Sequence, residues 1–392
     1  MKLKDIDVLR KIYSEPPLAA AAVTILFFSL PVIIAIFTRG YILLPAGYTY
    51  TLKVYPIYGI AAIVLDLLLI YFFSVSPVIR LRFHSVLTPD VVRILLVLFY
   101  LLITWTSFYI INAKLNFVSS LLSDPLATML NVGGGLVEEK LLKSFFFGIS
   151  GCLGFALIKD SDSLLLRFSG FMTMLTIALF YFFVGRREIS LMTLCFLLMV
   201  KREKISRLYL IIIGGLLATI LIFVLSVRIS MQNNTDPLYA TDSEELSPVA
   251  YSAYVIQHAT PSITRSFTEV TPLRAKLFRT TISAAYIKSQ TGYNDVANPV
   301  LGIGGVIYMY GFIVPAVMVL IVGAFSRSIA GEYRRKKSPV LKLLLIYMTF
   351  KTVNLFRNGE IPIVMIDVIL FFILSIPALY LTFTPKTTVA YD

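Results

Sequence analysis

Clusters of cationic and acidic side chains lie at the ends of long apolar segments in this chain. Arg186-Arg187-Glu188 separates two such segments, and Arg357-Asn358-Gly359-Glu360 separates the last two. Guanidinium groups bind phosphate oxygens through paired hydrogen bonds, and a neighbouring carboxylate can take up or release a proton. The two clusters predict a site for a polyanion such as a pyrophosphate group, with Glu188 or Glu360 as its base.

A third set of cations lies in the polar segment 231–300, whose later part has the spacing of an amphipathic helix. We expect one or two helices there, lying at the membrane surface. Arg279 precedes an apolar helical face, so we expect it to point inward and join the anion site. His258, on the same segment, titrates in the range that a general base needs and is a third candidate for that role.

The composition excludes a soluble protein. Of the 392 residues, 58% are hydrophobic and 15% charged, and the mean hydropathy is +0.84, which leaves too little polar surface to cover a globular domain. The apolar runs are long and continuous, as in membrane helices rather than barrel strands. The net charge of +13 is explained by loops anchored on the cytoplasmic side, without a nucleic-acid partner.

We therefore expect an all-α polytopic membrane protein with about ten membrane helices. Residues 1–392 would form a single membrane domain, with 231–300 as one long loop within it. The ten apolar segments are 17–37, 54–75, 94–112, 145–159, 163–184, 189–200, 208–230, 301–326, 339–355 and 361–383.

Basic residues before the first segment place the N-terminus in the cytoplasm. An even number of spans places the C-terminus there too, and puts the long loop and both short clusters on the outer side. The predicted location is a bacterial inner membrane with the site facing the periplasm.

Polar residues inside the apolar segments give further expectations. Asp66 and Asp367 are costly within a membrane, so each should be paired or functional. Lys351 is close enough to the 357–360 turn to face the same region. Small residues in 302–305 permit close helix packing. Cys152 and Cys195 lie in apolar runs and are interpreted as core residues rather than as a disulfide or a metal site.

Several short patterns are similar to the O-antigen polymerase (Wzy) family. Gly185-Arg186-Arg187-Glu188 resembles the segment that opens a mid-chain span in that family. The stretch 271–276, followed by the Gly- and Tyr-rich start at 302–311, resembles the end of its long loop. Arg357, near the outer end of a late span, also matches.

This resemblance implies a helical GT-C-like membrane fold and a metal-independent glycosyltransferase without cofactors. Its substrate would be an oligosaccharide repeat unit linked to undecaprenyl pyrophosphate, and its partners would be membrane lipids and a chain-length regulator (co-polymerase). The residues that would bind the pyrophosphate are Arg186, Arg187, Arg279 and Arg357. The residues that would bind the glycan are Arg265, Arg274, Tyr308, Tyr310 and Asn358.

Two other functions remain open on the sequence. An O-antigen ligase shares the membrane plan but transfers glycan to a lipid A core. A lipid-linked-sugar flippase or other transporter would use Asp66 and Asp367 as coupling residues, although the chain lacks the internal repeat typical of such proteins.

Overall fold

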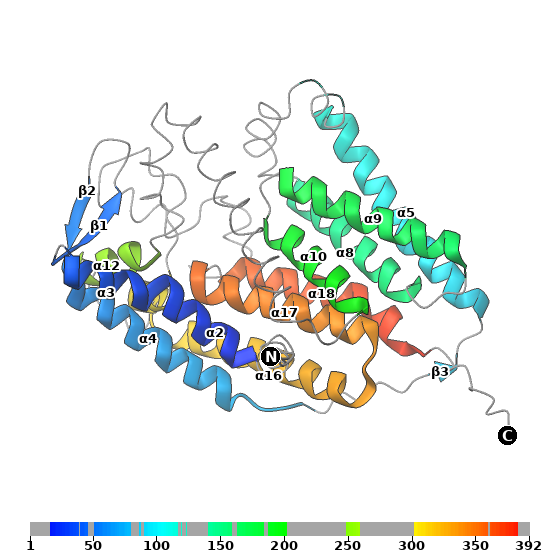
Figure 1. The fold of residues 1–392 in the computed structure, drawn as a ribbon. Coiled ribbons are helices and arrows are strands. Elements are labelled where there is room, and N and C mark those ends of the chain that lie inside the picture. Colours follow the sequence, from blue (N-terminus) through cyan, green and yellow to red (C-terminus); the bar gives the residue numbers. More distant parts are fainter. Residues whose placement is uncertain are drawn as a thin grey trace, which may run out of the picture. The chain divides into compact units, whose positions relative to one another are not determined.

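The computed structural model is almost entirely helical over the residues it describes (Figure 1). The described residues are 16–38, 40–45, 51–79, 86–87, 90–116, 119, 123, 140–158, 163–183, 187–201, 248–258, 302–359 and 361–382.

Most of the helices follow the predicted apolar segments, whereas α12 and the strands β1 and β3 lie outside them. The α-helices are α2 Pro16–Thr24, α3 Leu30–Thr38, α4 Pro56–Val75, α5 Asp90–Leu115, α8 Lys140–Ile158, α9 Leu164–Phe183, α10 Arg187–Lys201, α12 Pro248–His258, α15 Ile303–Tyr310, α16 Ile313–Lys336, α17 Pro339–Asn358 and α18 Ile361–Tyr380. A π-helical turn, η1 Ile25–Ser29, joins α2 to α3. The strands are β1 Ile42–Pro45, β2 Thr51–Val54, β3 Val86–Leu87 and β4 Leu381–Thr382.

Five helices in the described part of the chain are long and apolar enough to cross a membrane: 56–75, 91–113, 164–181, 313–336 and 339–357. In α4 and α5 only 28% and 22% of the apolar window is buried. The remaining surface carries exposed Ile, Leu and Val side chains, which suits contact with lipid tails rather than with water. The chain is thus an α-helical membrane-embedded protein. The predicted segment 208–230 lies outside the described residues.

The chain divides into two compact units, and the division falls within α16, α17 and α18. Unit 1 comprises 1–79, 204–331 and 348–368, and unit 2 comprises 80–203, 332–347 and 369–392.

Unit 1 is built around one face of α4, on which Gly59, Ala62, Asp66, Leu69 and Phe73 are buried. These positions recur every three or four residues and form a single stripe along the helix. Helices α2, α12 and α15 pack on α4, and the small residues at the start of the stripe let them approach closely. The acidic Asp66 lies in the middle of this otherwise apolar stripe.

Helix α12 is the part of segment 231–300 that the structure describes, and it is buried within unit 1. The one or two surface helices expected from the later part of this segment lie outside the described residues. The residues of α12 from 249 to 256 are buried, because α12 contacts α4, α15 and the β1–β2 hairpin. The Tyr55 backbone N–H at the start of α4 donates a hydrogen bond to Gln257 Oε1, 3.3 Å away, which joins the hairpin end of unit 1 to the end of α12.

The predicted segment 301–326 is broken into two helices. Helix α15 ends at Tyr310, Gly311 adopts φ +90°, and α16 begins at Ile313. A positive φ of this kind is open to glycine and strained for other residues. The apolar run continues through the break, so hydropathy alone gave no sign of it.

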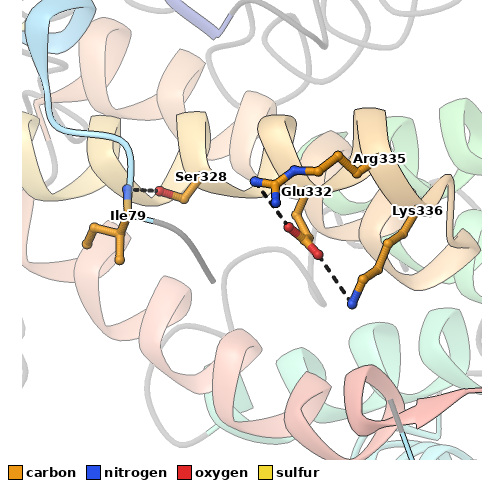
Figure 2. Close-up of polar contacts among 5 residues, drawn as sticks. All are labelled: Ile79, Ser328, Glu332, Arg335 and Lys336. Atoms are coloured by element: carbon orange, nitrogen blue, oxygen red, sulfur yellow. Dashed lines mark hydrogen bonds and ion pairs between the residues drawn. The ribbon is translucent and has the colours of Figure 1, made fainter. Parts of the chain in front are cut away.

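The C-terminal end of α4 is tied to α16. Arg327 donates hydrogen bonds to the carbonyl oxygens of Ser74, at 2.6 Å, and of Ser76. Ser328 Oγ accepts a hydrogen bond from the Ile79 N–H at 2.8 Å (Figure 2). The last carbonyl groups of a helix have no partner within it, and a cation also matches the helix dipole there. Arg327 therefore caps α4.

Unit 2 contains α5, α8, α9 and α10, packed through an aromatic cluster. Phe147 of α8 contacts Phe180 and Tyr181 of α9, with ring centroids 5.2 and 5.8 Å apart. At one end of α5, Arg93 donates a hydrogen bond to the Leu157 carbonyl at 3.0 Å. β3 pairs in parallel with β4.

The basic C-terminal end of α16 contains one buried carboxylate. Glu332, with 4% of its side chain exposed, forms ion pairs with Arg335 at 3.5 Å and Lys336 at 3.3 Å, one turn further along the helix (Figure 2). Its carboxylate offsets part of the positive charge of Arg334, Arg335 and Lys336 in the last turn of α16.

Candidate functional site

The turn between α17 and α18 holds the best-described part of the predicted anion site. Helix α17 ends at Asn358, and Gly359 follows with φ +60°. The Gly359 N–H donates to the Leu355 carbonyl at 3.0 Å, which is the closing bond of a left-handed helix cap. Helix α18 then begins at Ile361. This tight connection places Arg357 in the last turn of α17, immediately before the chain reverses.

A partly buried ion pair joins α17 and α18 about two helical turns from Gly359. Lys351 Nζ of α17 lies 2.6 Å from Asp367 Oδ2 of α18, with 6% and 24% of the two side chains exposed. The sequence singled out both residues but did not pair them. Lys351 lies eight residues before Gly359 and Asp367 eight residues after it. Residues equally distant from the turn of a helical hairpin face each other, so this spacing was the signal that identifies the pair.

Arg357 is half-buried and lies on another face of α17 from Lys351. Six residues separate them, which is about 9 Å along the axis and about 120° around it. The expectation that Lys351 and Arg357 face the same region therefore needs correction: Lys351 is directed at Asp367. The preceding residue, Phe356, is fully buried and packs edge-on against Phe73 of α4 with centroids 6.1 Å apart. Packing of Phe356 and the ion pair together immobilise the turn that carries Arg357.

His258, a candidate base, is the last residue of α12 and is exposed. Its ring lies 4.5 Å from that of Tyr254, one turn earlier, at a tilt of 42°. The ring contact fixes the imidazole on the side of α12, where water can reach it.

The Arg186-Arg187-Glu188 cluster lies between α9 and α10. Arg187 and Glu188 are the first two residues of α10, so both backbone positions are at a helix N-terminus. Ser190, two residues on, donates a hydrogen bond to the Ala178 carbonyl of α9 at 2.8 Å. This bond brings the start of α10 against the end of α9, which places the backbone of Arg187 and Glu188 in unit 2.

The predicted glycan contacts are placed only in part. Tyr308 is half-buried on α15, Tyr310 is the last residue of the same helix, and Asn358 is the last residue of α17. The remaining predicted site residues lie outside the described part of the chain: Arg186, Arg265, Arg274, Arg279 and Glu360.

A second polar site, which the sequence only partly indicated, lies in the core of unit 1. Asp66 Oδ1 accepts a hydrogen bond from the Gly304 N–H at 2.8 Å, and Ser252 Oγ accepts one from the Gly302 N–H at 3.0 Å. Gly302 is the N-cap of α15 and Gly304 is its second residue, and the first N–H groups of a helix have no partner within it. The sequence identified Asp66 as costly in a membrane, but its partner is a backbone group 238 residues away, which no local pattern reveals.

The described residues contain no group of three or more His, Cys, Asp or Glu side chains placed to hold a metal ion. Comparison with family models, with curated proteins and with solved structures finds no match for this chain. The contacts described above are therefore the basis for the functional argument.

Proposed function

We propose that this protein is a polymerase of lipid-linked oligosaccharides, which acts on repeat units attached to undecaprenyl pyrophosphate at the outer face of a bacterial inner membrane. The observation that carries the proposal is the position of Arg357. Its guanidinium group is carried at the end of a membrane helix, beside a tight glycine turn, and the partly buried Lys351–Asp367 pair links the two helices that flank that turn.

The proposed reaction explains why a rigid cation is useful. Attack by a sugar hydroxyl on the anomeric carbon breaks the bond to the pyrophosphate, so negative charge grows on a phosphate oxygen. A guanidinium already fixed in a partly dehydrated place stabilises that charge without having to reorganise, and one such contact contributes about 3 kcal/mol at the transition state. Arg186, Arg187 and Arg279 would complete the pyrophosphate site. Glu188, Glu360 or His258 would accept the proton of the attacking hydroxyl.

Two contacts within unit 1 support the proposed ten-span orientation, in which both termini are cytoplasmic. The cap by Arg327 joins the ends of α4 and α16, which the charge pattern assigns to the cytoplasmic side. The bond from Tyr55 to Gln257 joins two segments that the same pattern assigns to the outer side.

A ring contact runs against this orientation. Phe73 is near the end of α4 assigned to the cytoplasm, whereas Phe356 is near the end of α17 assigned to the outer side, and yet their rings touch. The ten-span orientation does not account for this contact. Either α17 ends within the bilayer, or one of the two ends lies on the opposite side. The labelling experiment described in the Discussion separates these cases.

The activity is tested with the purified full-length protein in liposomes, supplied with undecaprenyl-pyrophosphate-linked repeat units and excess EDTA. We expect a ladder of longer glycans that Arg357→Ala abolishes and Arg357→Lys restores in part. Arg335→Ala is the control, because Arg335 is an exposed arginine in the last turn of α16.

Three results would contradict the proposal. Equal ladders from the wild type and Arg357→Ala would remove Arg357 from the site. Label transferred to a lipid A core would indicate a ligase. Label carried across sealed vesicles without any lengthening would indicate a flippase.

A further inference from the structure

Asp66 is a buried carboxyl group that the proposed reaction does not use. It is fully buried near the middle of α4, a candidate membrane span. Its Oδ1 accepts the Gly304 N–H, whereas its Oδ2 has no hydrogen-bond partner among the residues that the structure describes. One oxygen is thus satisfied by the start of α15, and the other is buried with no donor among the described residues.

The described elements packed against α4 offer Asp66 no counter-ion. Helices α2, α3, α15 and the turn η1 contain no charged residue. On α12 the titratable side chain other than tyrosine is His258, whose neighbour Gln257 contacts Tyr55, about 16 Å along α4 from Asp66.

The described cations near the C-terminal end of α4 either bond to other groups or lie far from Asp66. Arg327 caps the carbonyls at 74 and 76, and Lys351 is paired with Asp367. Arg357 follows Phe356, whose ring contacts Phe73, and Phe73 lies about 10 Å along α4 from Asp66.

An ionised carboxylate in this position is strongly unfavourable. The partial positive charge at the start of α15 offsets part of the cost of removing the charge from water, but it is no substitute for a full counter-ion. A protonated carboxyl group avoids that cost and keeps the observed geometry, because its carbonyl oxygen still accepts the Gly304 N–H.

We propose that Asp66 is a proton-binding site whose occupancy is coupled to the docking of α15 on α4. While α15 is docked, the proton stays covalently bound to Oδ2. When the start of α15 moves away and water enters, the O–H bond breaks, the proton passes to a water molecule, and the carboxylate that remains is hydrated. Rebinding of a proton precedes redocking.

The helix that would move is built as a separate element. Helix α15 has eight residues and is disconnected from α16 by Gly311, so it can shift without bending a longer helix. Its contact with α4 is close, because a Cβ atom at Gly304 would lie 2.6 Å from the Ala62 carbonyl oxygen and 2.9 Å from Asp66 Oδ1. A small displacement of α15 therefore exposes the carboxyl group. The inference holds whichever reaction the chain performs.

The test is infrared spectroscopy of the full-length protein in liposomes, in which a protonated carboxyl group gives a carbonyl band that ionisation removes. At neutral pH we expect a band that is lost in Asp66→Asn and retained in Asp367→Asn, since Asp367 is paired with Lys351. Labelling the aspartate side chains with ¹³C should shift the carbonyl band of the wild type. In Asp66→Glu the band should come from a glutamate, so the ¹³C-aspartate label should no longer shift it. This comparison between Asp66→Glu and the wild type tests the assignment even if Asp66→Asn fails to fold.

Coupling to α15 is read out separately. In a background with Cys152→Ala and Cys195→Ala, a cysteine replacing Ile303 should react with a membrane-permeant maleimide several-fold faster at the pH at which the band disappears. Asp66→Asn should remove that pH dependence. Absence of the Asp66-dependent band, or a band that appears only when sodium is withdrawn, overturns the proton assignment. A band without any change in reactivity overturns the coupling.

Discussion

Lys351 Nζ and Asp367 Oδ2 meet 2.6 Å apart across the α17–α18 hairpin. The pair fixes the register of the two helices at a level about 9 Å along α17 from Arg357. Both charges are largely removed from water, so each depends on the other.

Replacing Lys351 alone should destabilise the protein more than replacing both partners. Lys351→Met leaves the Asp367 carboxylate without its partner and should lower the free energy of unfolding by about 3 kcal/mol. Lys351→Met combined with Asp367→Leu should recover most of that loss, because no charge is then stranded. Denaturant unfolding of the four proteins in detergent measures this cycle. Strictly additive losses would show that the pair has no coupling.

Two glycine-to-alanine substitutions should act in opposite directions. Gly304→Ala forces a Cβ against the Ala62 carbonyl and should cost about 1–3 kcal/mol. Gly331→Ala, in α16, meets no atom within 4 Å and should stabilise the helix by up to about 1 kcal/mol, since alanine loses less backbone entropy. Thermal unfolding compares them. An equal effect of the two changes would contradict the close packing of α15 on α4.

Loss of the Arg327 cap should be distinguishable from loss of a surface arginine. Arg327→Ala leaves the Ser74 and Ser76 carbonyls without their charged donor and should cost about 2 kcal/mol. Arg335→Ala removes an exposed ion-pair partner of Glu332 and should cost under about 1 kcal/mol. Unfolding midpoints of the two variants provide the comparison. A larger loss from Arg335→Ala would refute the capping role.

Cysteine labelling tests the orientation of the chain. In the background without Cys152 and Cys195, His258→Cys should react with a membrane-impermeant maleimide added to spheroplasts. Lys337→Cys, an exposed position after α16, should react only once the membrane is opened. The Phe73–Phe356 contact makes a third position informative, so Asn358→Cys should be labelled from outside if α17 crosses the bilayer. Labelling of Lys337→Cys in sealed spheroplasts would reverse the predicted orientation.

The five candidate membrane helices were predictable because each is a long apolar run. A helix satisfies its own backbone hydrogen bonds, which a lipid environment requires. The break at Gly311 was not predictable from hydropathy, since both sides of it are equally apolar. Helix α12 lies in none of the ten predicted apolar segments. Its burial depends on contacts with α4, α15 and the β1–β2 hairpin, which no local sequence pattern places beside it.

The polar turn that carries Arg357 was predictable from the sequence, and the pairing of residues around it was less so. Arg357 and Gly359 were recognised from a short polar interruption between two spans. The partnership of Lys351 with Asp367 follows from hairpin geometry once the turn is centred on Gly359. The contact of Asp66 with Gly304 required the tertiary fold, because a free backbone N–H at a helix start carries no signature in the sequence.

The cap on α4 has a consequence for how the protein is made. Arg327 is separated from Ser74 by 253 residues, so α4 leaves the ribosome long before its C-terminal carbonyls can be capped. Unit 1 also needs residues up to Val368, whereas α5, α8, α9 and α10 of unit 2 are synthesised between its parts. During biogenesis, α4 is therefore in the membrane before Arg327 can bond to its C-terminal carbonyl groups. A chain truncated before Arg327 should be a substrate for membrane quality control.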